Sequence, residues 1–153
     1  MSNFLKLTAL ALTAIVLLPS GAHLLELPAK MELARDEYFL VQGLYSGWAW
    51  FAVPIAAALA ANLALFLAER RRDRATAHYA LVAAAFVTAS LGVFFALVFP
   101  ANQATANWTT PTGDWRELRF AWEWGHALGA LLVFASLISI GRALIGCRPA
   151  GSS

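Results

Sequence analysis

Apolar residues are gathered into four long runs, separated by polar segments. The runs lie at about residues 7–25, 44–68, 80–99 and 127–145. A helix rises 1.5 Å per residue, so roughly 20 apolar residues cross a hydrocarbon core about 30 Å thick. Because unpaired backbone polar groups are costly inside a bilayer, runs of this length favour helices. The pattern predicts an all-α integral membrane four-helix bundle with antiparallel, up-down helices.

Local signals place the helix ends around these runs. The first helix is expected to end at Leu27, because Pro28 restrains the residue before it and donates no helix hydrogen bond. Asp114 followed by Glu117 is a capping pattern, which predicts that the fourth helix begins near Trp115. We therefore expect one transmembrane domain over residues 1–153, with spans at about 5–27, 43–68, 79–99 and 115–145.

The composition agrees with a membrane protein and excludes several partners. Of 153 residues, 60% are hydrophobic and 13% are charged, which is far from a soluble average. A net charge of +2 is too small to indicate nucleic-acid binding. Lipid is the expected surrounding, and homo- or hetero-oligomerisation is left open. The only cysteine, Cys147, excludes an intrachain disulfide and is expected to be inert.

The distribution of basic residues predicts the orientation. The segment ERRRDR at residues 69–74 holds four arginines, and lysine and arginine accumulate in cytoplasmic loops. Four spans then place both termini in the cytoplasm. Seven lysines and arginines fall inside and four outside on this topology. The inside set is Lys6, Arg70, Arg71, Arg72, Arg74, Arg142 and Arg148.

The first run also has features of a signal peptide. Lys6 precedes the apolar stretch, and Ser20, Gly21 and Ala22 form a small-residue cleavage site. The apolar run nevertheless continues beyond that site to Leu27, which favours a retained helix. Retention and cleavage both stay open.

Polar and aromatic residues gather at the predicted outer ends of the helices. Six tryptophans lie there and form either an interfacial belt or the wall of a pocket: Trp48, Trp50, Trp108, Trp115, Trp122 and Trp124. Side chains with amide or hydroxyl groups lie at the same level: Gln42, Tyr45, Asn102, Gln103 and Asn107. The deeper Asn62 is interpreted as an interhelical hydrogen-bonding group.

Two histidine and carboxylate pairs face each other across this layer. His23 and Glu26 close the first helix, Glu123 and His126 open the fourth, and each pair shares a helical face at spacing three. Imidazoles and carboxylates on facing helices are ligands for a zinc, iron or copper ion. These four residues are therefore metal-ligand candidates. A metal-free pocket that handles protons and a purely structural network are the alternatives.

The structural alternative has its own pattern. Glu26 lies four residues before Lys30, and Glu123 lies four residues after Arg119, so both carboxylates have a helical ion-pair partner. Such pairs are common and stabilise little. Gly125 and Gly129 permit close packing of the fourth helix, which is a weak signal of function.

Four segments carry a family resemblance. They are HLLELPAKMEL, YFLVQGLYSGWAW, FPANQATANWTTPTGDWRELR and WEWGHALGALL, and PANQATANWT and WEWGHA are the most specific parts. They resemble an uncharacterised bacterial family of four-helix membrane proteins that is distantly similar to anthrone oxygenases. Pro100, Asn102, Trp122 and His126 match the family's two motifs. An arginine often follows that histidine by three residues, where this chain has Gly129.

The resemblance implies an activity and roles for the motif residues. Anthrone oxygenases convert an anthrone to an anthraquinone with dioxygen and are described without an identified cofactor. His126 would be the base, and Glu123 or Asn102 would orient it. The cofactor is expected to be one transition metal ion or none. The implied location is the bacterial plasma (inner) membrane, with the site on the periplasmic or outer side.

These observations predict a small membrane-embedded oxidoreductase or oxygenase-like enzyme that acts on a lipophilic or aromatic substrate. The alternative is a non-catalytic membrane subunit, or a metal-binding or docking protein of a larger complex. The expected substrate-binding residues are Gln42, Tyr45, Trp48, Asn107, Trp108 and Trp122.

Overall fold

The computed structural model describes residues 2–145, and within that range it contains helices and turns but no β-strand. Four stretches are long and apolar enough to cross a membrane, as the sequence predicts. They are Asn3–Glu32, Trp48–Glu69, Arg74–Ala104 and Trp115–Ile145. The chain is therefore an all-helical protein with the features of a multi-pass membrane protein. Cys147 and Arg148, which entered the sequence predictions, lie outside the described residues.

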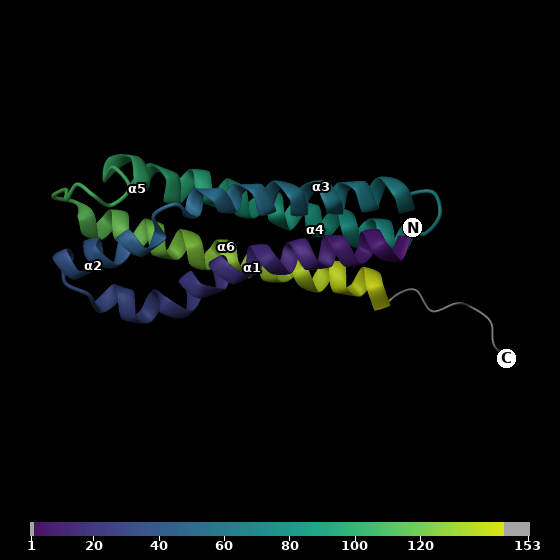
Figure 1. The fold of residues 1–153 in the computed structure, drawn as a ribbon, viewed down its shortest axis with the longest axis horizontal. Helices are drawn as coiled ribbons and strands as arrows, with labels where there is room; N and C mark the ends of the chain where they lie inside the picture. The colour runs from purple at the N-terminus through teal and green to yellow at the C-terminus, as the bar shows by residue number, and fades with distance from the viewer. Residues whose placement is uncertain (1, 146–153) are drawn as a thin grey trace.

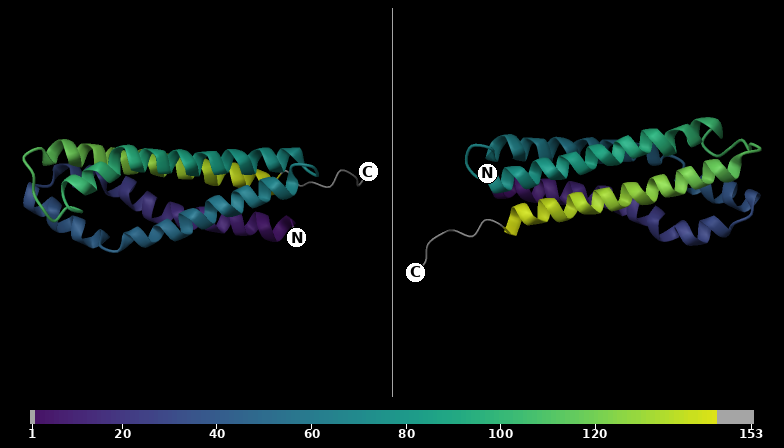
Figure 2. Two further views of the ribbon diagram at one scale, coloured as in Figure 1. Left: turned by 90° about the horizontal axis from the view of Figure 1, so that it is seen from above. Right: turned by 180° about the vertical axis from the view of Figure 1, so that it is seen from behind.

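The long helices form a four-membered ring. They are α1 (Ser2–Glu32), α3 (Ala52–Glu69), α4 (Arg74–Val93) and α6 (Trp115–Ile145). Consecutive long helices run in opposite directions along the molecule (Figure 1). Each of α1 and α4 contacts both α3 and α6, and α4 and α6 lie side by side in the two further views (Figure 2). The short helices α2 (Arg35–Gln42) and α5 (Phe99–Ala104) lie at one end, called here the α2 end.

Large apolar side chains point outward along the ring. Leu18 is 72% exposed, and several others are at least 40% exposed. Exposed apolar side chains over the whole length of a bundle are expected where lipid replaces water as the solvent. The outward set includes Leu7, Leu63, Leu67, Leu81, Phe95, Leu128, Leu131, Phe134 and Ile138. These helices therefore have surfaces suited to contact with a lipid bilayer.

The first helix is longer than predicted. The predicted end at Leu27 is wrong, because α1 continues through Pro28 to Glu32. A proline inside a helix removes one backbone hydrogen bond and bends the helix without necessarily ending it. The second half of α1, which bends away from the bundle, contains Pro19 near its beginning and Pro28 near its end (Figure 1). Lys30 lies in this continuation and is nevertheless buried.

The second span begins later than predicted. A single helix from residue 43 is replaced by two short 3₁₀ turns, η1 (Gly43–Tyr45) and η2 (Trp48–Phe51), and α3 starts only at Ala52. Gly47 between the turns has φ +84°, a left-handed conformation that glycine adopts at little cost. The helix predicted to start at residue 43 is therefore interrupted by a left-handed glycine.

The third span extends beyond both predicted ends. It begins at Arg74, where the Asp73 side chain accepts hydrogen bonds from the backbone N–H groups of Ala75 and Thr76. It continues through a π-helical turn, η3 (Phe94–Val98), into α5 (Phe99–Ala104), whereas the span was predicted to end at residue 99. A π turn is wider than an α turn and accommodates a proline that cannot donate the next hydrogen bond.

The start of the fourth helix agrees with the prediction. α6 begins at Trp115, and the Asp114 carbonyl oxygen accepts hydrogen bonds from the Glu117 and Leu118 N–H groups. About three turns into α6, at Gly125, the helix approaches η3 very closely. A Cβ atom added at Gly125 would lie 2.8 Å from Val98 Cγ2 and 3.1 Å from Leu97 Cβ, whereas one at Gly129 would meet no atom within 4 Å.

Neutral polar groups link the helices at mid-depth. Asn62 is fully buried and donates to Thr13 Oγ1 of α1 at 3.3 Å, which confirms its interhelical interpretation. Ser136 and Ser139 of α6 donate to backbone carbonyl oxygens of α4 at 2.9 and 2.8 Å. Interhelical hydrogen bonds of this kind are ordinary in membrane bundles.

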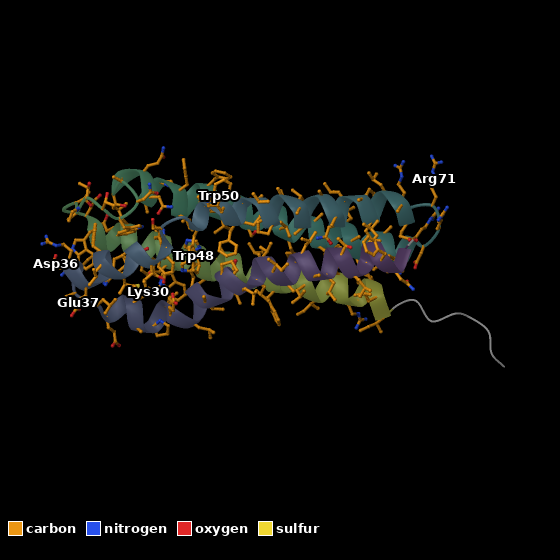
Figure 3. All side chains as sticks on the ribbon, viewed as in Figure 1. Lys30, Asp36, Glu37, Trp48, Trp50 and Arg71 are labelled. Carbon is orange, nitrogen blue, oxygen red and sulfur yellow. The ribbon has the colours of Figure 1, made fainter. Side chains whose placement is uncertain are left out.

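A buried lysine lies at the opposite end of the bundle from α2. Lys6 is 1% exposed and donates to Thr76 Oγ1 at 3.3 Å, and that hydroxyl donates to Asp73 Oδ2 at 2.7 Å. The contact joins the start of α1 to the start of α4. Sequence reasoning treated Lys6 only as a topological marker. We call this end, with exposed arginines at residues 70–72 and 74, the arginine end; Figure 3 labels Arg71 there.

Gly125 offers a stability test with a matched control. Gly125→Ala is expected to destabilise the protein by about 1–3 kcal/mol, because the new methyl group overpacks against Val98 and Leu97. Gly129→Ala should be neutral or stabilising by up to about 1 kcal/mol, since alanine is the better helix former. Unfolding in detergent by added dodecyl sulfate measures both. Equal effects of the two substitutions would contradict the close approach.

Candidate functional site

A buried lysine is the centre of the polar site at the α2 end. Lys30 is 3% exposed, and its Nζ lies 3.2 Å from Glu123 Oε1 and 3.4 Å from Glu26 Oε2. The same nitrogen lies 4.8 and 4.9 Å from the ring centres of Tyr45 and Trp122. Cations are stabilised by such aromatic faces, and more strongly where water is excluded. Figure 3 labels Lys30 within the bundle end.

The site combines residues from α1, α2, η1 and α6. We call it the Lys30 cluster, and it consists of His23, Glu26, Lys30, Tyr38, Tyr45, Trp122, Glu123 and His126.

The ammonium group of Lys30 determines the hydrogen-bonding role of His23. Besides the two carboxylates, Lys30 Nζ contacts His23 Nδ1 at 3.4 Å. An ammonium group donates and cannot accept, so His23 Nδ1 is the acceptor and the ring proton of a neutral His23 lies on Nε2. The three N–H donors of Lys30 match three partners within the cluster. Lys30 therefore organises the site and has no donor left over for a substrate.

Each carboxylate also accepts a hydrogen bond from a tyrosine. The Tyr38 hydroxyl donates to Glu123 Oε1 at 2.9 Å, and the Tyr45 hydroxyl donates to Glu26 Oε2. Both tyrosines belong to the segment between α1 and α3, so the carboxylates fasten that segment to the bundle. Glu123 is fully buried, and its second oxygen, Oε2, has no hydrogen-bond partner.

The two tyrosine hydroxyls are held in the neutral form. Burial raises the pKa of Tyr38 well above its usual range, and the Glu123 carboxylate raises it further. Burial likewise raises the pKa of Tyr45, with the hydrogen bond to Glu26 as the next cause. Both hydroxyls thus remain donors to the carboxylates in moderately alkaline solution.

The two histidines are stacked on each other. The ring centres of His23 and His126 are 4.1 Å apart with an angle of 30° between the planes. The Trp122 ring centre lies 4.9 and 4.2 Å from theirs, and its plane is steeply inclined to both, at 87° and 64°. His126 is only half-buried, and its ring forms no hydrogen bond with any residue in the described part of the chain. His126 is thus an imidazole with both nitrogens unengaged, next to aromatic faces.

The four metal-ligand candidates lie together, but their arrangement does not suit a shared ion. Imidazole lone pairs lie in the ring plane, so the nearly parallel rings of His23 and His126 do not direct nitrogens to one point between them. Lys30 occupies the position between Glu26 and Glu123 that a cation would take. Within residues 2–145 no three histidine, cysteine or carboxylate side chains form a group that could hold a metal ion. As they lie, these residues do not fit a shared metal ion.

Asn102 contacts indole groups rather than a histidine. Its Oδ1 accepts from Trp122 Nε1 at 2.8 Å and from Trp108 Nε1 at 3.2 Å. The amide therefore positions Trp122, whose ring centre lies 4.2 Å from that of His126. Among the described residues no hydrogen bond joins Asn102 to His126, so any orienting effect of Asn102 acts through Trp122.

The turn after α5 is left-handed over three residues. Ala106, Asn107 and Trp108 have φ angles of 49°, 57° and 63°, which are uncommon for residues with a Cβ. The Trp108 N–H donates to Thr105 Oγ1 at 3.0 Å. The turn places the Trp108 ring 5.0 Å from that of Tyr38 and buries it. Asn107 itself is exposed and is not brought to the Lys30 cluster.

The remaining predicted substrate-binding residues border the cluster. Gln42 is buried and its Nε2 has no hydrogen-bond partner. The half-buried Trp48 lies 5.3 Å from His23 and 4.9 Å from Tyr45, measured between ring centres. On its other side is a shallow, mainly apolar groove of about 300 Å³, lined by Ser46, Gly47, Trp48, Trp50, Phe51 and Pro54.

Sequence reasoning missed two members of the cluster. Lys30 was considered only as a surface partner of Glu26, whereas it also binds Glu123 across the bundle. Tyr38 was passed over because residues 29–41 were expected to be a solvated segment, yet Tyr38 is fully buried in α2. The expected Arg119 and Glu123 pair does not form, and Arg119 Nη1 instead donates to the Leu33 carbonyl oxygen at 2.9 Å.

Comparisons with known proteins bring no relative. No family model, no curated protein and no solved structure matches the chain.

The tyrosine hydroxyls can be followed by alkaline titration. Tyr38→Phe/Tyr45→Phe should leave the rise in absorbance at 295 nm below about pH 11 unchanged from the parent, because neither hydroxyl ionises there in the folded protein. A raised folded-state pKa means that stability falls as pH increases past the unfolded value of about 10. A smaller absorbance rise in the double variant would contradict the burial of these hydroxyls.

The Lys30 and Glu123 pair can be tested by a double-mutant cycle. Lys30→Met is expected to cost about 3–5 kcal/mol, because it leaves Glu123 buried without its cation. Adding Glu123→Gln should recover part of that loss, since the amide carries no charge. Dodecyl sulfate unfolding of the parent, both single variants and the double variant gives the coupling energy. If the two single-variant losses in unfolding free energy add up to that of the double variant, the two groups are not coupled.

Proposed function

We propose that the protein is a membrane-embedded, oxygenase-like oxidoreductase in which His126 removes a proton from a lipophilic aromatic substrate. One observation carries this proposal. His126 is the titratable group of the Lys30 cluster whose side-chain nitrogens are unengaged within the described residues, while it is half-buried among aromatic rings. A neutral imidazole has a nitrogen lone pair that can accept a proton.

The proposed reaction needs only the substrate, dioxygen and a base. His126 takes a proton from an acidic ring-system carbon, and the aromatic system delocalises the resulting carbanion. The carbanion adds to dioxygen, the proton returns to form a hydroperoxide, and loss of water leaves a carbonyl group on that carbon. The rings of His23 and Trp122 border the reacting base, with ring centres 4.1 and 4.2 Å from that of His126. The resemblance to anthrone oxygenases supports the same substrate class.

The surroundings of His126 support a lipophilic substrate. Trp48 lies 5.3 Å from His23 of the Lys30 cluster, measured between ring centres, and it also lines the apolar groove. A planar hydrocarbon dissolved in the bilayer would reach that groove laterally. The deep burial of Lys30, Glu123 and His23 favours an enzyme over a docking subunit, because a docking surface requires exposed contact groups.

The proposed orientation places both termini in the cytoplasm of a bacterium. The exposed arginines at residues 70–72 and 74 gather at one end, and such loops are retained on the cytoplasmic side. The Lys30 cluster is at the other end, so it would face the periplasmic side of the inner membrane.

Oxygen consumption with an anthrone as probe tests the proposed function. His126→Gln should reduce the rate by about 10²–10⁴-fold, the usual contribution of a positioned base. His78→Gln is the matched control, since His78 is exposed in α4 far along the chain from the cluster. Full oxygen uptake by His126→Gln, or no enzyme-dependent uptake by the parent, would refute the proposal.

A further inference from the structure

A second site lies at the extreme α2 end, beyond the Lys30 cluster. A cavity of about 650 Å³ opens between the segment that joins α1 to α2 and the first turn of α6. Its lining comprises Met31, Glu32, Leu33, Ala34, Arg35, Asp36, Trp115, Arg116 and Arg119. Figure 3 labels Asp36 at this tip of the molecule. The volume lies within the range of small-molecule sites.

Arg119 is fixed in the wall of this cavity. It is 8% exposed, and its Nη1 donates to the Leu33 carbonyl oxygen at 2.9 Å and to that of Lys30 at 3.4 Å. Its guanidinium lies 4.7 Å from the Trp115 ring centre. Its buried Nε has no hydrogen-bond partner. A buried donor on a charged group without an acceptor is costly, so a ligand oxygen that reaches it would be favourable.

Arg116 also lies close to the Trp115 ring. Its guanidinium lies 5.0 Å from the Trp115 ring centre, and its side chain is exposed at the cavity. Neither Arg116 nor Arg119 forms an ion pair with a carboxylate in residues 2–145. Two guanidinium groups without carboxylate partners therefore line one cavity next to a shared indole.

The backbone adds positive potential at the same place. α6 begins at Trp115, so the positive end of the dipole of a 31-residue helix lies at the cavity. The first N–H groups of a helix lack intrahelical acceptors and commonly bind anions.

The carboxylates in the lining do not cancel this charge. Asp36 is paired with Arg35 through a 2.9 Å contact between Oδ1 and Nε. Glu32 is exposed at the last residue of α1. The guanidinium groups of Arg116 and Arg119 thus remain available to an anion.

We propose that this cavity binds the phosphate group of a phospholipid headgroup or of free phosphate. Several oxygens on one tetrahedral centre match guanidinium donors that approach from two directions, and arginine is the residue best suited to phosphate. The cavity lies at the tip of the bundle, beyond its apolar length, where headgroups are located. The site does not depend on the proposed oxidation, because its residues are outside the Lys30 cluster.

Binding of two probes tests the site. The protein in nanodiscs of phosphatidylcholine is titrated with phosphatidylglycerol and analysed by native mass spectrometry for retained anionic lipid. Inorganic phosphate is then added as a competitor. Displacement of the lipid identifies a site that also takes free phosphate, and retention identifies a site for the lipid headgroup. Both outcomes support recognition of phosphate at this cavity, provided that the variants below behave as expected.

The variants are chosen to preserve the fold. Arg119 anchors α1 to α6, so its replacement risks unfolding. Arg116→Gln changes an exposed side chain and should weaken retention of phosphatidylglycerol by about tenfold or more. Arg71→Gln at the arginine end removes the same charge and should change it less than about twofold. Absence of preference for the anionic lipid in the parent, or an equal loss in both variants, would overturn the proposal.

Discussion

The site depends on one constraint: a buried charge at the end of a membrane bundle must be matched by partners from several helices. Lys30 of α1 is satisfied only when Glu123 of α6 and the ring of Tyr45 are in place. Removing one partner of a buried ion pair is far more costly than the pair gains over an apolar substitute. The cluster therefore makes the positions of α1, η1 and α6 dependent on one another, and the aromatic rings around His126 are held as a consequence.

The fold could be predicted from the sequence because it follows from the lengths of the apolar runs. Four runs of sufficient length predict four helices, and Gly125 indicated close helix packing. The helix boundaries were less accessible. The first and third spans were predicted to end at residues 27 and 99, but helical structure continues through Pro28 and Pro100. Local propensity is a weak guide where surrounding helices compensate for a missing hydrogen bond.

The candidate site was partly accessible. Spacing of three placed His23 with Glu26 and Glu123 with His126, and the structure brings all four together. Spacing says nothing about which cation lies between facing helices, so Lys30 was not recognised as the centre. The burial of Tyr38 follows from the short helix α2 at the bundle end. An eight-residue helix is too short for its hydrophobic pattern to predict it from the sequence.

The π turn in the third span determines which way the following residues face. Inserting one extra residue into a turn of 3.6 rotates every later side chain by about 100° around the helix axis. The wide turn at Phe94–Val98 thereby sets the angular phase of α5, where Asn102 accepts from the indoles of Trp108 and Trp122. Had the helix continued in regular α geometry, the same amide would point in a different direction by more than a quarter of a turn. The π turn thus determines where Asn102 points, and through Asn102 it determines the position of the Trp122 ring beside His126. No direct contact between η3 and Asn102 is required for this effect.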